Sequence, residues 1–258
     1  MAIHASAVVD PTARLGDGVA VGPFSVVGAD VEIGAGSIID SHAVIGGPTV
    51  IGERCHVFPF ASIGLGPQDL KFKGEPTRLL CGSDNIFREF VTVHRGTVGG
   101  GGVTSIGSRN LFMAYAHIAH DCQIGSDTIF ANAATLAGHV TVGDFATVGA
   151  SSGVHQFCRV GNHAFIGGYS VVVKDALPYM KSVGNHARVF GVNTIGLERR
   201  GFGKDAIAAI KKAYRILFQS KLNTSGAVAR MREELADSTE VRYLVEFIES
   251  SERGVVKR

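Results

Sequence analysis

The sequence predicts an all-β solenoid, a parallel β-helix built of hexapeptide repeats, with a C-terminal α-helical domain. An aliphatic or aromatic residue recurs at every sixth position over most of the chain, and helical spacing is confined to its C-terminal part. A period of six is neither the 3.6 of a helix nor the simple alternation of a long strand. It is typical of short strands, each ended by a turn, that wind into coils and stack.

The first block of hexads begins near the N-terminus and runs without a slip. Its eleven members are aliphatic: Ile3, Val9, Leu15, Val21, Val27, Ile33, Ile39, Ile45, Ile51, Val57 and Ile63. We expect each to point into a shared core, with the frequent following Gly allowing close backbone approach at a corner. Three hexads complete one triangular coil, so residues 18 apart should stack in columns.

Two segments interrupt the hexads and are predicted to be loops, near residues 65–78 and 96–105. The first is charged and carries two prolines, whereas the second contains four consecutive glycines. Those glycines lack the strand–Gly–Lys–helix context of a phosphate-binding loop and indicate a flexible loop. A long loop that leaves a regular solenoid is more often functional than a mere solvated excursion, which is the alternative for residues 65–78.

Between the loops we place the inward positions at Leu80, Ile86 and Thr92, and a third block runs from Ile106 to Val172. The blocks hold 11, 3 and 12 hexads, or 26 in all. After residue 178 the spacing becomes helical and predicts helices over 204–218, 227–235 and 240–248. The predicted domains are therefore the β-helix, residues 1–177, and the helical domain, residues 178–258.

The composition excludes several function classes. A formal net charge of +2 over 258 residues gives no indication of a nucleic-acid partner. No apolar run approaches the roughly 18 residues of a membrane span, and the first residues lack the pattern of a leader peptide. The four widely spaced cysteines form no CxxC pair, as is usual in a reducing compartment. We therefore expect a cytoplasmic protein.

Four histidines and one carboxylate are predicted to share one edge of the coil. Asp121 and His139 are 18 residues apart and fall in one column, while His120 and His155 take adjacent places on the same edge. If the Gly-rich loop adds no coil, His94 stacks one coil from His120. Such convergence favours a functional site over five unrelated surface residues.

Two chemistries suit this edge. Three neutral imidazoles bind zinc and leave a position open for water. Alternatively, one imidazole removes a proton from a hydroxyl nucleophile, and a carboxylate such as Asp121 orients it and stabilises its protonated form. The backbone N–H of Gly138 would then stabilise a developing oxyanion. The spacing alone leaves both chemistries open.

Eight stretches in fixed order point to a family. They are Gln68–Lys71, Gly74–Arg78, His94–Thr97, Ala116–Asp121, Leu136–His139, His155–Cys158, Gly184–His186 and Arg199–Phe202. Together with the helical tail, they resemble the bacterial UDP-N-acetylglucosamine acyltransferases that begin lipid A synthesis, over essentially the whole chain. Hexads alone would be weak support, since many acyl- and acetyltransferases contain them.

The resemblance implies a homotrimer of left-handed parallel β-helices with each active site between two subunits. It implies transfer of an (R)-3-hydroxyacyl group from acyl carrier protein, on its phosphopantetheine arm, to the 3-hydroxyl of UDP-N-acetylglucosamine. In this family His120 would be the general base, Asp121 its assistant and Gly138 the oxyanion donor. No metal, no other cofactor and no covalent acyl-enzyme are implied.

The resemblance also implies a set of substrate-binding residues. They are Gln68, Asp69, Lys71, His94, His117, His139, His155, Gln156, Gly168, Asn193 and Arg199. Lys71 would suit a phosphate or the acyl chain's hydroxyl. Gly168 matches the position that measures acyl length, and its open groove predicts a chain of about twelve to fourteen carbons. Ile195 departs from the family's acidic residue, which removes one polar contact to the nucleotide.

A late cluster of basic residues is predicted to dock the acidic acyl carrier protein. Its members are Lys174, Lys181, Arg188, Arg199, Arg200, Lys204, Lys211, Lys212 and Arg215. The ordinary alternative for such charges is a solvated helix face.

Three other functions are alternatives for a hexad solenoid with such histidines. The related N-acyltransferase of the same pathway carries a uridine-binding domain before its hexads, whereas here the hexads begin at Ile3. A β-helix carbonic anhydrase would hold zinc with the histidines. A non-catalytic solenoid would lose no turnover on His120→Ala.

Overall fold

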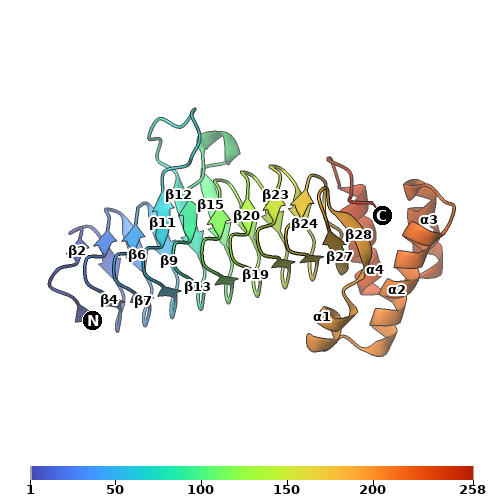
Figure 1. Cartoon of the computed structure of the whole chain (residues 1–258), viewed down its shortest axis with the longest axis horizontal. Coiled ribbons are helices and arrows are strands. Elements are labelled where there is room, and N and C mark those ends of the chain that lie inside the picture. The colour runs from blue at the N-terminus through green and yellow to red at the C-terminus, as the bar shows by residue number, and fades with distance from the viewer. Residues whose placement is uncertain (1, 258) are drawn as a thin grey trace.

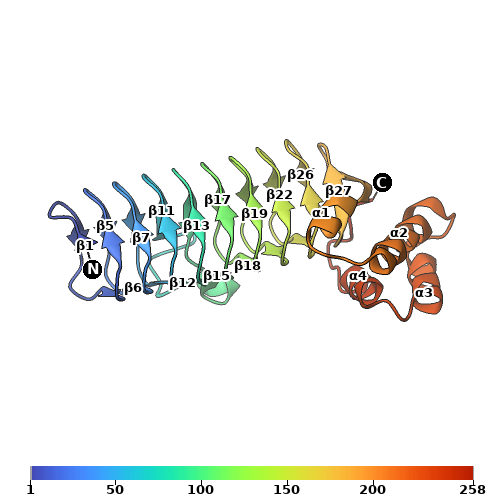
Figure 2. The same cartoon turned by 90° about the horizontal axis from the view of Figure 1, so that it is seen from below.

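A three-sided coil of short strands leads into a cluster of helices at its C-terminal end (Figure 1). This computed structural model describes residues 2–257; Met1 and Arg258, the outer ends of the two predicted domains, lie outside the described residues. Consecutive strands enter a first, a second and a third sheet in turn. Figure 2 shows the coils following one another in a row, with the larger helices beyond the last coil.

The three sheets are parallel except for one antiparallel pair at the end of the first. The first sheet contains β1 (Ala2–Ile3), β4 (Ala20–Val21), β7 (Ile38–Ile39), β10 (His56–Val57), β13 (Ile86–Phe87), β16 (Leu111–Phe112), β19 (Ile129–Phe130), β22 (Thr147–Val148), β25 (Phe165–Ile166), β27 (Met180–Val183) and β28 (Arg188–Val192). The second contains β2 (Val8–Val9), β5 (Val26–Val27), β8 (Val44–Ile45), β11 (Ser62–Leu65), β14 (Thr92–His94), β17 (His117–Ile118), β20 (Thr135–Leu136), β23 (Gly153–Val154) and β26 (Val171–Val172). The third contains β3 (Arg14–Leu15), β6 (Val31–Ile33), β9 (Thr49–Ile51), β12 (Arg78–Cys81), β15 (Val103–Ile106), β18 (Gln123–Ile124), β21 (Thr141–Val142) and β24 (Arg159–Val160).

The predicted hexads correspond to strands one for one. Within residues 2–257, the strands up to Val172 number 26, as the hexads do. The predicted 18-residue columns are also confirmed, because Ile118 pairs with Leu136 and Val142 with Val160. Each coil therefore packs its inward side chain on the equivalent side chain of the next, and stacked neighbours together build a core that no single coil would have.

Between the two loops the predicted phase is wrong by one residue. The inward, buried residues there are Cys81, Phe87 and Val93, each one position after the predicted one. Cys81 pairs with Ile51 and Phe87 with Val57, which fixes this register. Because successive strand residues face opposite sides, a slip of one exchanges the inward and outward sets. The buried Cys81 acts as a small hydrophobic residue at the inward position that was predicted for Leu80.

Both loops leave the coil through the corner between the second and third sheets, which we call the second–third corner. The first occupies residues 66–77, between β11 and β12, and the second residues 95–102, between β14 and β15. The predicted second loop was too long, because Val103–Ser105 pair within β15. The two loops project side by side (Figure 1), and the Gly96 N–H donates to the Arg78 carbonyl at the base of the first, 3.3 Å away.

The helical tail contains α1 (Thr194–Arg199), α2 (Lys204–Gln219), α3 (Thr224–Glu234) and α4 (Thr239–Glu249). The last three match the predicted helices to within a few residues, whereas α1 and the strands β27 and β28 were not predicted. Arg159 joins the tail to the coil: its Nε lies 2.8 Å from the Asp175 carboxylate, and its Nη2 donates to the Phe247 carbonyl of α4. Within residues 2–257, no helix has the length and apolarity that crossing a bilayer requires.

Candidate active site

His120 and Asp121 lie together at the second–third corner, between β17 and β18. His139 takes the equivalent corner place one coil further on, and its N–H donates to the His120 carbonyl at 3.0 Å. Asp121 and His139 both have a φ of 62°, in the left-handed region that non-glycine residues seldom adopt. The shared conformation sets their side chains beside one another, as the column rule predicted.

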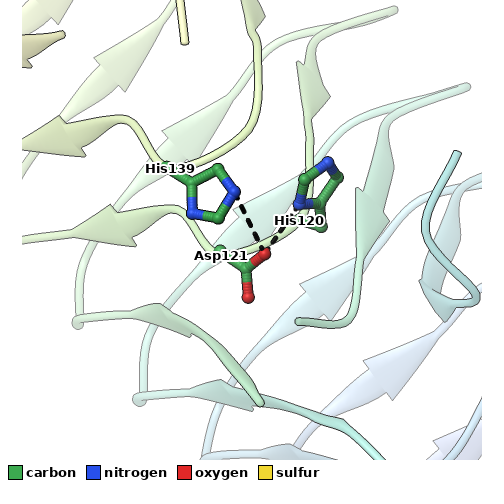
Figure 3. Close-up of side chains that lie close together, drawn as sticks. All are labelled: His120, Asp121 and His139. Atoms are coloured by element: carbon green, nitrogen blue, oxygen red, sulfur yellow. Dashed lines mark hydrogen bonds and ion pairs between the residues drawn. The ribbon is translucent and has the colours of Figure 1, made fainter. Parts of the chain in front are cut away.

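The Asp121 carboxylate faces both imidazoles (Figure 3). The Nδ1 of His120 lies 2.7 Å from Oδ2 of Asp121, and the Nε2 of His139 lies 3.7 Å from the same oxygen. Since an ionised carboxylate only accepts, the His120 Nδ1 carries the hydrogen and its Nε2 keeps a free lone pair. The His139 distance is too long for a hydrogen bond. His120 is thus arranged as a base oriented by Asp121.

Gly138 leaves the room that the His120 ring occupies. A Cβ built on Gly138 would lie 2.6 Å from Cε1 and 2.8 Å from Nε2 of His120, closer than real carbon contacts allow. Within residues 2–257, the Gly138 N–H donates to neither a backbone nor a side-chain acceptor. A free backbone N–H therefore belongs to the residue that packs against the His120 ring.

Thr97 holds the far side of the carboxylate. Its backbone N–H donates to Oδ1 of Asp121 and its hydroxyl to Oδ2, both at 2.7 Å. This contact was not predicted, because the Gly-rich segment indicated a flexible loop. The structure corrects that interpretation: Val98–Gly100 form a 3-10 helix that Thr97 caps. The signal that could have found Thr97 is its hydroxyl within the His94–Thr97 motif, directly ahead of the glycines.

His94 and His117 form a second imidazole pair close to the first. Their ring centroids are 5.2 Å apart, and the Thr92 hydroxyl lies 2.7 Å from the His117 Nδ1. Burial, together with the positive charges that His117 and His120 can carry, lowers the pKa of His94 to about 4. Burial and His120 likewise lower the pKa of His117. Both rings are therefore neutral at physiological pH, and His117 shares a hydrogen bond with the Thr92 hydroxyl.

The predicted stacking of His94 on His120 is corrected by one place. Val93 pairs with Ile118, so the register continued by one residue sets His94 opposite Ala119. The cause is the phase error described above, since the prediction counted the coil from Leu80. His94 consequently contacts the edge of His117 instead of stacking over His120.

The remaining predicted residues of this corner extend the site along the coil axis. His155 and Gln156 lie exposed at the same corner between β23 and β24, and Phe157 stacks on His139 with centroids 4.4 Å apart. Gln68, Asp69 and Lys71 are on the first loop, which leaves from this corner. Gly168 is elsewhere, at the corner between the first and second sheets.

Asn193 and Arg199 are not brought to His120. They line a cavity of about 730 Å³ on the outer face of the first sheet, beneath α1, together with Ile195. Asn193 donates to the His163 carbonyl at 3.1 Å, at the corner between the third and first sheets. Within one chain, the predicted site residues are therefore divided among all three corners of the coil.

His120, Asp121 and His139 are the residues that would hold a metal ion, because their donor atoms lie within 4.8 Å of one another. The donor set nevertheless fits a metal poorly. Asp121 already accepts from the Thr97 N–H, the Thr97 hydroxyl and His120, and this last bond uses the Nδ1 of the ring. The same atoms fit a hydrogen-bonded general base without rearrangement.

Comparison with known proteins agrees with the two parts of the fold. The family described as "Bacterial transferase hexapeptide (six repeats)" matches residues 12–47 and 103–138, and "Udp N-acetylglucosamine O-acyltransferase; Domain 2" matches residues 175–256. The chain is 52% identical over 255 residues, 99% of both proteins, to the acyl-[acyl-carrier-protein]–UDP-N-acetylglucosamine O-acyltransferase of Thiobacillus denitrificans. The chain belongs to this O-acyltransferase family.

Other members of the O-acyltransferase family match along their whole length. The Myxococcus xanthus enzyme is 51% identical over 99% of both proteins. The LpxA structure from Acinetobacter baumannii is 44% identical, covers 99% of both chains and superimposes with a TM-score of 0.96. The Thiobacillus denitrificans and Myxococcus xanthus enzymes bear the O-acyltransferase name, and neither is named as an N-acyltransferase or a carbonic anhydrase. The resemblance stated from the motifs is thereby confirmed.

Proposed function

We propose that the protein transfers an (R)-3-hydroxyacyl group from acyl carrier protein to the 3-hydroxyl of UDP-N-acetylglucosamine, the first step of lipid A biosynthesis. The observation that carries this function is the His120–Asp121 hydrogen bond beside the free Gly138 N–H, in a chain whose relatives bear this activity in their names. The acyl donor brings its own phosphopantetheine arm, so the reaction needs no cofactor of the protein.

The reaction follows from the arrangement of these three residues. The Nε2 of His120 takes the proton of the sugar 3-hydroxyl as that oxygen attacks the thioester carbonyl. The Gly138 N–H donates to the oxyanion of the tetrahedral intermediate, and Asp121 stabilises the protonated imidazole. The intermediate then collapses, the C–S bond breaks, and His120 returns the proton to the departing phosphopantetheine thiolate.

Substrate roles divide according to position. The group at the second–third corner would hold the sugar, the phosphates and the acyl carbonyl: Gln68, Asp69, Lys71, His94, His117, His139, His155 and Gln156. Asn193 and Arg199, around the cavity beneath α1, would hold the nucleotide. Gly168 would bound the acyl chain, at the far edge of the second sheet.

We propose a homotrimer, because the two parts of the site then meet. The second–third corner of one subunit would face the first sheet and α1 of the next, and three such contacts close a ring. In a triangular coil, the second and first sheets share one edge. Each subunit would use the second sheet toward one neighbour and the first sheet toward the other. The corner between the first and second sheets would therefore face the threefold axis.

The side chains of that edge support the trimer. A ladder of stacked rings runs along it, made of Phe24, His42, Phe60, Phe90 and Tyr115, with centroids 4.9 to 5.2 Å apart. Phe24 is 62% exposed and Tyr115 61% in the single chain. A row of exposed aromatic rings is typical of a surface that another protein covers.

We also propose the handedness of the coil, the domain boundary and the location of the protein. The coils are left-handed, and the chain divides into the β-helix, residues 1–177, and the C-terminal domain, residues 178–258. β27 and β28 would belong to the second domain and continue the first sheet beneath it. The reaction takes place in the cytoplasm, a reducing compartment in which four free, buried cysteines are usual.

The basic cluster would receive the acyl carrier protein. Most of its members are exposed, on or beside α1 and α2. Lys212 is engaged within the tail, with its Nζ 2.7 Å from the Glu234 carboxylate, and we leave it out of the docking surface. Lys181, Arg199 and Arg200 line the cavity beneath α1, whereas Lys174 follows β26 at the second–third corner.

The deciding experiment measures acyl transfer from 3-hydroxyacyl carrier protein to UDP-N-acetylglucosamine, with wild type beside His120→Ala. Loss of a general base lowers turnover about a hundredfold or more, while the variant stays folded and assembled. Absence of transfer by wild type with every hydroxyacyl chain would overturn the proposed function. Transfer that survives the substitution would remove His120 from its role.

A further inference from the structure

The Asp121 carboxylate is enclosed by the second loop as well as by the histidines. Asp121 is 4% exposed and accepts two hydrogen bonds from Thr97 in addition to the one from His120. Both the Thr97 hydroxyl and the His120 Nδ1 meet the same oxygen, Oδ2, at 2.7 Å. The position of that oxygen, and therefore the direction of the imidazole, depends on Thr97.

The loop holds Thr97 in place through its own hydrogen bonds. The Thr97 carbonyl accepts from the N–H groups of Gly100 and Gly102, at 3.0 and 2.8 Å. Gly100 is packed so closely against Asp121 that a Cβ at this position would overlap the carboxylate. Gly99, its neighbour in the same 3-10 helix, has nothing within 4 Å of an added Cβ.

We propose that Thr97 is a positioning residue of the active site, which fixes Asp121 and through it the tautomer and direction of the His120 ring. Gly100 then has a specific function, since only a residue without a side chain lets the loop pack against the carboxylate. This inference rests on the proposed function for its kinetic consequence, but the geometry of His120 can be measured without any substrate.

The first test replaces the Thr97 hydroxyl. Thr97→Val keeps the shape and the backbone N–H and removes one donor to Oδ2. We expect kcat to fall about tenfold or more with KM little changed, because the loss concerns the base and not substrate contacts. Thr97→Ser restores the hydroxyl and should recover most of the activity. Thr128→Val is the matched control, since Thr128 is a buried residue whose hydroxyl donates to Asn110, 2.7 Å away.

The second test uses the neighbouring glycines. Gly100→Ala should displace the Asp121 carboxylate and lower kcat, whereas Gly99→Ala should remain within about twofold of wild type. Both changes add one methyl group to the same short helix. A Gly100→Ala variant as active as Gly99→Ala would contradict the proposed enclosure.

The third measurement is independent of acyl transfer. Nitrogen-15 NMR of histidine-labelled enzyme reports which ring nitrogen of His120 carries the hydrogen. We expect the Nδ1–H tautomer in wild type and Thr97→Ser, and a mixture in Thr97→Val. An unchanged tautomer together with an unchanged kcat in Thr97→Val would overturn the proposal. If wild type transfers no acyl group yet Thr97→Val shifts the tautomer, the proposed function fails while the positioning role stands.

Discussion

The imidazole of His120 occupies the space that a side chain at position 138 would need. Gly138→Ala would place a methyl carbon 2.6 Å from Cε1, so the ring must turn away from its present direction. We expect kcat to fall by about a hundredfold, since base and oxyanion donor are both disturbed. Gly153→Ala is the control, because nothing lies within 4 Å of a Cβ at that position of β23. Equal activities of the two variants would contradict this packing.

Mixed trimers should regain the activity that each of two variants lacks. In the proposed trimer, His120→Ala removes the base of one subunit, and Arg199→Ala weakens the proposed nucleotide site that the next subunit contributes. Random mixing leaves about one quarter of the sites with neither substitution. Co-expression followed by assay should recover that fraction of wild-type turnover. No recovery, with trimers verified by native mass spectrometry, would show that each site lies within one subunit.

The stability of the protein should fall in acid partly because of His94. Burial lowers its pKa from the ordinary 6.5 to about 4 in the folded chain. Below pH 6.5 the unfolded chain therefore binds a proton at His94 that the folded chain does not bind. The free energy of unfolding consequently decreases as the pH falls toward 4. His94→Gln removes this contribution. Thermal unfolding of both proteins between pH 7 and pH 4.5 should show the smaller decline for the variant; parallel declines would contradict the assignment.

The phenylalanine stack inside the coil should contribute strongly to stability. Phe87, Phe112 and Phe130 are fully buried, with ring centroids 5.0 and 4.9 Å apart. Phe112→Ala should cost about 3–5 kcal/mol, through lost burial and the cavity left behind. Phe190→Ala, at a 70% exposed site, should change stability by about 0.5 kcal/mol or less. Urea titration at one fixed protein concentration compares them, and similar losses would refute the difference in packing.

The acyl length should depend on Gly168. Wild type should prefer chains of about twelve to fourteen carbons, and Gly168→Met should shift the optimum to shorter chains by filling the groove. Assays with a series of hydroxyacyl carrier proteins measure both. A wild-type optimum at about ten carbons would contradict the open groove.

The repeat made most of the fold predictable. A hydrophobic side chain at every sixth position leaves little freedom in where strands begin, so the 26 hexads correspond to the 26 described strands up to Val172. The phase after the first loop was not predictable, because the repeat does not fix the length of the loop at residues 66–77. When the hexads resume, both Leu80 and Cys81 are hydrophobic enough to take the inward position. α1 escaped prediction since six residues are too few to display helical periodicity.

The site was predictable where it follows the column rule and not where it depends on loops. Asp121 and His139 come together because 18 residues make one coil. Thr97 reaches Asp121 through a loop conformation that its glycines permit but no periodicity specifies. Asn193 is among the substrate-binding residues that the resemblance implies, yet it lies on another side of the chain from His120, which only the relation between neighbouring subunits would reconcile.

The regular stacking of coils also fixes distances along the axis of the solenoid. Neighbouring strands lie about 4.8 Å apart, so the number of coils sets the axial distance from His120 to α1. An added coil of 18 residues would satisfy every local contact, since each coil touches only its neighbours. In the proposed trimer it would still displace the nucleotide residues of one subunit from the base of the next by about 4.8 Å. The number of coils between His120 and α1 would therefore be constrained by catalysis as well as by folding.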